Sequence, residues 1–263
     1  MSYEDLNYPT PAAIEGKFPG SKVLIIGSGP STNQLIPYKQ LIRKYFDAII
    51  ACNYAFKEFD QQADIHLVTE KTSKTSTNEV YKWLNCGEYR TDVVRILNWK
   101  GIEYYDRKYN THKSNRASFC NTGGVDIRRY NNGSEEGLLQ GAPGTQGFSL
   151  GTVMLCAIHL ATILGAKEVY TIGADLCFKD EFDHFYKDDV YRNRPAKVKP
   201  KNAHQIIEVE LNGKRVKTLQ YFKESAELID KLIPTIFGSI KVVDFSDGLL
   251  KAPIKSRLSN VFV

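Results

Sequence analysis

The feature that most constrains the fold is a glycine-rich turn directly after a buried strand. The run KVLII at Lys22–Ile26 predicts a core strand, and the letters GSGPS follow it at residues 27–31. Glycines permit positive φ in a tight turn and let a ligand approach the backbone. Pro30 suits the first turn of a helix, where its missing N–H costs nothing. The pattern predicts a strand–turn–helix unit of an α/β protein.

Apolar runs of strand length recur along the chain and alternate with helical patterns. Strands are predicted at residues 47–52, 65–69, 93–97, 102–105, 168–172 and 239–245, and helices at residues 33–45, 149–164 and 220–233. Gly165 follows the second helix in the position of a C-terminal cap. The sequence therefore predicts an α/β, Rossmann-like fold with a mostly parallel sheet and helices on both faces.

Two polar stretches interrupt this alternation. Residues 106–147 are rich in Asn, Gly, Ser and basic residues, and residues 179–201 are strongly charged. A long polar segment inside a compact domain is usually functional or mobile. Further along, Asn212-Gly213 separates two strand-like runs and is a type I′ hairpin signal. We expect one nucleotide-binding α/β domain over residues 1–263, with a mobile, lid-like insertion at residues 179–203.

The charge balance is mildly basic. The 263 residues include 35 Lys and Arg against 30 Asp and Glu, a net charge of +5. This charge suits a phosphate-bearing small ligand or an anionic surface. A protein that binds duplex nucleic acid usually carries a denser basic stripe, so no nucleic-acid partner is expected.

The cysteines and the apolar stretches indicate a cytoplasmic protein. The five cysteines form no CxxC pair, which favours reduced, mostly buried thiols. The first residues carry acids and prolines without an apolar core, so no secretory signal is expected. The longest apolar stretch, residues 150–166, is shorter than a typical membrane-spanning helix and is better explained as a core helix.

Candidate ligand-binding residues follow the predicted strands and precede the long helix. Open α/β sheets bind ligands at the carboxyl ends of their strands, and helix N-termini there attract phosphate. We expect free backbone amides at the glycine turn and polar side chains at the neighbouring strand ends. A purely structural turn and simple helix capping remain the alternatives. The candidates are Gly27, Ser28, Gly29, Pro30, Ser31, Asn53, Ser149, Gly151, Thr152, Gly173 and Asp175.

The charged insertion carries the candidate catalytic group. His204 follows a basic run at residues 192–201, where it is placed to act as a general base beside an anionic leaving group. The alternative is a solvated, flexible segment. His184 lies in an acidic stretch, but its spacing matches no metal-ligand motif, so no metal site is expected.

Several of these motifs resemble one superfamily. The string KVLIIGSGPS, the strand ending in Cys52-Asn53, the helix ending LGAKEVYTIGAD and the tail KVVDFSDGLL…SNVFV resemble the bacterial sialyltransferases of glycosyltransferase family 42. They equally resemble two groups of relatives, the motility-accessory-factor glycosyltransferases and the archaeal 6-hydroxymethylpterin diphosphokinases (MptE-like). The resemblance implies a nucleotide-binding transferase of Rossmann-like fold.

The sialyltransferase resemblance also implies roles for single residues. It places a CMP-sugar on the glycine turn and Asn53, and the acceptor-activating base at His204, within Asn202-Ala203-His204. Those enzymes carry a tyrosine shortly after the aspartate that matches Asp175, whereas Leu-Cys-Phe follows here. Stabilising the departing phosphate then falls to residues of the insertion. These leaving-group or lid candidates are Tyr186, Tyr191, Arg192 and Arg194.

Three functions remain open on the sequence. The first is a metal-independent glycosyltransferase with a CMP-nonulosonate-like donor, a glycan acceptor and no cofactor. The second is an MptE-like diphosphokinase that moves pyrophosphate from ATP to a pterin and needs Mg²⁺. The third is a nucleotide-binding protein without catalysis. A peripheral contact with a membrane surface and oligomer formation are compatible with each.

Overall fold

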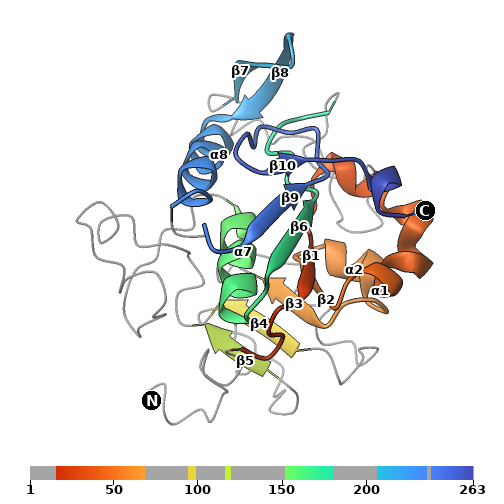
Figure 1. Cartoon of the computed structure of the whole chain (residues 1–263). Helices are drawn as coiled ribbons and strands as arrows, with labels where there is room; N and C mark the ends of the chain where they lie inside the picture. The colour runs from red at the N-terminus through yellow and green to blue at the C-terminus, as the bar shows by residue number, and fades with distance from the viewer. Residues whose placement is uncertain are drawn as a thin grey trace, which may run out of the picture.

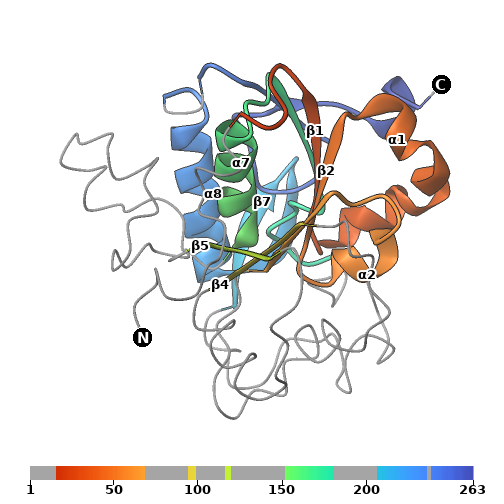
Figure 2. The same cartoon turned by 90° about the horizontal axis from the view of Figure 1, so that it is seen from below.

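The fold is built on one parallel β-sheet, shown from two directions in Figures 1 and 2. The computed structural model describes residues 16–68, 94–98, 116–119, 152–179, 206–235 and 238–262. Eight strands pair in the order β10-β9-β6-β1-β2-β3-β4-β5, and every pairing is parallel. They are β1 Lys22–Ile26, β2 Ala48–Cys52, β3 Ile65–Val68, β4 Val94–Asn98, β5 Arg116–Phe119, β6 Glu168–Ile172, β9 Lys241–Asp244 and β10 Ile254–Lys255.

Helices cover both faces of this sheet, which confirms the predicted α/β, Rossmann-like fold. The helices α7 (Val153–Ile163) and α8 (Gln220–Leu232) lie on one face, and α1 (Ile42–Tyr45) and α2 (Ala55–Phe59) lie on the other (Figures 1 and 2). Side chains alternate between the two faces along each strand. In β1, for example, Val23 and Ile25 pack in the core beneath α7, while Leu24 and Ile26 pack in the opposite core.

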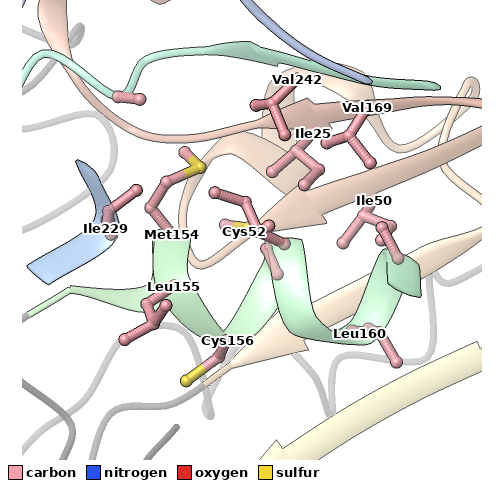
Figure 3. Close-up of a cluster of buried hydrophobic side chains, with 14 of the residues drawn as sticks. Ile25, Ile50, Cys52, Met154, Leu155, Cys156, Leu160, Val169, Ile229 and Val242 are labelled. Carbon is pink, nitrogen blue, oxygen red and sulfur yellow. The ribbon is translucent and has the colours of Figure 1, made fainter. Parts of the chain in front are cut away.

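The apolar helix α7 fills the larger of the two cores. Figure 3 shows Met154, Leu155 and Leu160 of α7 in one buried cluster with strand residues that include Ile25 and Ile50. Thr152 caps the helix, because its Oγ1 accepts a hydrogen bond from Met154 N at 3.1 Å. Gly165 follows the last turn with φ of 87°, as predicted for a C-terminal cap.

The predicted hairpin and the helix after it are confirmed. Strands β7 (Ile206–Leu211) and β8 (Lys214–Leu219) pair antiparallel and lead directly into α8. Asn212 and Gly213 have φ of 52° and 75°, as a type I′ turn requires at both central positions. Within α8 the buried face consists of Ser225, Ala226, Ile229 and Leu232, at helical spacing.

Two stretches differ in part from the predicted local structure. The stretch 33–45 is not one α-helix but the 3₁₀ turns η3 (Pro30–Gln34) and η4 (Ile36–Leu41) followed by the single α-turn α1. Pro37 lies in the first turn of η4, and its missing N–H prevents a continuous α-helix through this point. The stretch 106–147, expected to be irregular, contains β5 at the sheet edge.

Other features of the described chain agree with the sequence. Cys52, Cys156 and Cys177 are free thiols in the core, and burial raises the pKa of Cys156 and of Cys177 to about 12. Within the ranges given above, no helix has the length and apolar character needed to cross a membrane. The strand expected at 102–105 and the insertion expected at 179–203 lie outside the described residues, apart from the first residue of the insertion.

Candidate functional site

The sheet has a topological switch point between β1 and β6. From β1 the chain continues on one side to β2 and β3, whereas β6, β9 and β10 lie on the other side. Ligands of open α/β sheets bind outside the carboxyl ends of the strands at such a point. Gly27 follows β1 and Gly173 follows β6, so the predicted glycine turn lies at this position.

The glycines at the switch point permit close packing of two strand ends. Gly27 N donates to Ile172 O at 2.7 Å, and Gly29 N donates to Gly173 O at 3.0 Å. A Cβ atom on Gly27 would lie 2.5 Å from Gly173 O and 2.9 Å from Met154 Cε. Internal packing therefore already requires glycine here. The contact with Met154 also places the first turn of α7 against the same strand ends.

Asp175 occupies the hydrogen-bond donors that the glycine turn was expected to offer to a ligand. Its Oδ2 accepts from Ser31 N at 3.1 Å and from Ser31 Oγ at 2.8 Å, and Ser31 Oγ accepts from Gly173 N at 2.9 Å. The expectation of free amides is therefore wrong for Gly27, Gly29 and Ser31. It failed because their partners come from β6 and the residues after it, far along the chain.

Asp175 is buried next to a second carboxylate. Asp244 Oδ1, at the end of β9, accepts from Thr171 Oγ1 at 2.8 Å and from Ser246 N at 3.0 Å, and its Oδ2 forms an ion pair with Lys255. Burial raises the pKa of Asp175 to about 6, and the negative charge of Asp244 adds to this effect while the bonds from Ser31 oppose it. Asp175 is thus a buried carboxyl group whose pKa lies well above its usual range.

Ser28 of the turn after β1 and Asn53 at the end of β2 lie at the same edge. Ser28 Oγ donates to Cys52 O at 3.2 Å, which ties the glycine turn to the residue before Asn53. Asn53 has a left-handed backbone, with φ of 48°, and its N–H donates to Leu67 O at 2.9 Å. Its side-chain Oδ1 is buried and has no hydrogen-bond partner within the described part of the chain. Such an acceptor is uncommon in proteins and calls for an explanation.

The structure brings most of the described candidates together. Asp175, Ser31, Gly173 and Gly29 are linked by hydrogen bonds, and Gly27 donates to Ile172 O beside them. Ser28 joins the turn to the end of β2, and α7 with its cap Thr152 adjoins Gly27. Pro30 begins η3 and is buried. The candidates outside the described residues are Ser149, Gly151, Tyr186, Tyr191, Arg192, Arg194 and His204.

Three residues at this edge escaped the sequence analysis. Ser246 Oγ accepts from Ala174 N at 3.0 Å, and a Cβ on Gly248 would overlap the Asp175 backbone. His66, within β3, contacts Asn53 O at 2.9 Å. The letters DFSDG directly after a core strand were a usable signal for Ser246 and Gly248. His66 offered none, because a histidine inside an apolar strand is most often a satisfied core residue. Among the residues described, no group of three or more His, Cys, Asp or Glu is arranged to hold a metal ion.

The titration of Asp175 leads to a prediction about stability. Because its pKa is raised in the folded protein, protonation favours folding fully below the usual pKa of 3.8, and this contribution is lost as pH rises to about 6. In Asp175→Asn the amide oxygen still accepts from Ser31 but does not titrate. Between about pH 4 and pH 7 the variant is expected to gain up to about 3 kcal/mol relative to wild type. Urea unfolding at several pH values measures this difference, and parallel profiles would contradict the assignment.

Comparison with solved structures places the chain near a protein of similar fold. No family model matches the chain, and no curated protein matches it. Among solved structures, the chain is similar to one described as the structure of MAf glycosyltransferase from Magnetospirillum magneticum AMB-1, with a TM-score of 0.55 and 17% sequence identity. The match covers 95% of this chain but 37% of that chain. At this identity the likeness shows the α/β fold.

Proposed function

We propose that this chain is a glycosyltransferase that takes a sugar from a nucleotide-activated donor, with a CMP-nonulosonate as the donor class. The observation that carries the proposal is the unpartnered, buried Oδ1 of Asn53 beside Ser28 at the switch point of the sheet. A ligand with a hydrogen-bond donor would satisfy this oxygen. The fold shared with a glycosyltransferase supports the class of reaction.

The charges at the switch point suggest how the nucleotide is oriented. An ionised Asp175 repels phosphate, and its Oδ2 already accepts two bonds from Ser31. We therefore assign the neutral, hydroxyl-bearing part of the nucleotide to the region next to Ser28, Asn53 and Asp175. The phosphate is assigned to the start of α7, where Thr152 caps a helix of 11 residues. Ser149, Gly151 and the cationic residues of the insertion complete the phosphate and acceptor side of the proposal.

The proposed transfer needs a base and no metal. The acceptor hydroxyl oxygen forms a bond to the anomeric carbon of the donor sugar, while the bond from that carbon to the phosphate oxygen breaks. CMP leaves with the electron pair of the broken bond. His204 takes the proton of the acceptor hydroxyl, and Tyr186, Tyr191, Arg192 and Arg194 are proposed to stabilise the charge on the departing phosphate.

A nucleotide panel tests this function against its alternatives. Thermal unfolding of the full chain is measured with CMP, CDP, UDP, ATP and GTP, each with and without Mg²⁺. The proposal predicts that CMP or CDP raises the melting temperature by a few degrees without metal, because a ligand that binds only the folded state stabilises it. Stabilisation by ATP only with Mg²⁺ would favour the diphosphokinase instead. The absence of any shift would contradict nucleotide binding altogether.

A further inference from the structure

His66 is a buried polar side chain next to the candidate site that the proposed transfer does not use. It lies on β3 with no exposed surface, and its ring stacks on Phe56 of α2 with centroids 4.2 Å apart and an angle of 11° between the planes. Its Nε2 lies 2.9 Å from Asn53 O. A carbonyl oxygen only accepts hydrogen bonds, so Nε2 carries the proton and donates it.

Strand β3 thus holds both backbone polar groups of Asn53. The N–H of Asn53 donates to Leu67 O at 2.9 Å, and its carbonyl accepts from His66. Asn53 has φ of 48°, a left-handed conformation that costs energy for residues other than glycine. Such a conformation persists only where the surroundings hold it, and it is common at functional sites. The two bonds from neighbouring residues of β3 provide this restraint.

By holding the backbone of Asn53, the same two hydrogen bonds also fix the direction in which its side chain leaves the backbone. Asn53 carries the unpartnered Oδ1 on which the proposed function depends, and it directly follows the residue that Ser28 contacts. We propose that His66 is a positioning residue, whose ring N–H holds Asn53 in the left-handed conformation that presents its amide to the nucleotide. This inference rests on the proposed function. His66 itself touches no ligand in this account.

Two substitutions of His66 in the full chain test the inference. His66→Phe keeps a flat ring for stacking but has no donor. It is expected to shift the side-chain amide resonances of Asn53 in ¹⁵N spectra and to weaken CMP binding about tenfold. His66→Gln places an amide donor at a similar distance from Asn53 O. It is expected to restore most of the wild-type Asn53 resonances and most of the CMP affinity. His159→Phe, which replaces a partly buried histidine on α7, controls for general effects on the core.

A double-mutant cycle separates positioning from a merely structural role. Glycine adopts the left-handed conformation unaided, so in an Asn53→Gly background His66→Phe is expected to cause no further loss of CMP affinity. Equal losses in the two backgrounds would overturn the inference. So would wild-type Asn53 resonances and wild-type CMP affinity in His66→Phe.

Loss of CMP binding by the wild type and misfolding of His66→Phe are the two remaining outcomes of these experiments. If wild-type protein does not bind CMP, the proposed function fails, while the Asn53 resonances still test whether His66 fixes Asn53. If His66→Phe does not fold, the ring tautomer of wild-type His66 is read from its ¹⁵N shifts. A proton on Nε2 supports the inference, and a proton on Nδ1 alone overturns it.

Discussion

Gly173→Ala is expected to lower the free energy of unfolding by about 3 kcal/mol, the largest loss we predict for a single methyl group. Gly173 has φ of 74°, which alanine adopts only with strain. A Cβ atom there would also overlap Thr32 Oγ1 and lie 2.6 Å from Gly27 O. Because these atoms belong to the turn after β1, the two strand ends would be forced apart. Urea unfolding of wild type and variant measures the loss.

Gly213→Ala is the matched control for this prediction. Gly213 has nearly the same φ, 75°, but a Cβ atom there meets nothing within 4 Å. Its replacement is expected to cost only the backbone strain, about 1 kcal/mol. The difference between the two variants isolates the packing of β1 against β6. Equal losses would mean that the strand ends tolerate a side chain at Gly173. That result would contradict the close packing of β1 against β6 at the switch point.

His204→Ala is expected to reduce the turnover of the proposed glycosyl transfer by about 10²–10⁴-fold, the usual contribution of a general base. Its affinity for CMP is expected to stay close to that of wild type, because the base acts on the acceptor hydroxyl rather than on the nucleotide. Steady-state rates with a CMP-activated sugar, together with CMP binding by calorimetry, measure both quantities. The two readouts distinguish a lost base from a damaged site.

His112→Ala is the control for the histidine prediction. His112 lies in another polar stretch for which no catalytic role is proposed. We expect its replacement to leave turnover unchanged. If His204→Ala retains wild-type turnover, His204 has no part in the mechanism. If both variants lose activity equally, the loss reflects general damage to the polar segments and not base catalysis.

Much of the sheet was predictable because most of its strands are apolar. Lys22–Ile26 is an almost continuous run of buried residues, and Val169, Thr171 and Ile172 are buried in Glu168–Ile172. The Asn212-Gly213 turn identified its hairpin. The failures have local causes. Pro37 interrupts a helical pattern, and Arg116–Phe119 is too polar and too short to be recognised as a strand. Strand β10 has two residues, so its sequence carries almost no pattern.

The candidate site was predictable in position but not in its hydrogen bonding. Asn53 and Asp175 were identified because strand ends in an open sheet meet at one edge. The bonds between Ser31 and Asp175 join residues 144 positions apart, and no local pattern reveals them. The role proposed for His66 depends on the backbone of Asn53, which only the folded structure shows. Long-range pairing therefore limited the prediction more than secondary structure did.

The central claim is that the edge formed by the ends of β1, β2 and β6 binds the nucleotide. Calorimetric titration of CMP into wild type, Asn53→Ala and Asn212→Ala tests it most directly. Both asparagines have a left-handed backbone, with φ of 48° and 52°, so the two replacements cause similar strain, but Asn212 lies in the exposed hairpin turn. We predict metal-independent CMP binding that weakens about tenfold in Asn53→Ala and is unchanged in Asn212→Ala. Equal affinity in all three proteins, or no binding to wild type, would contradict the account.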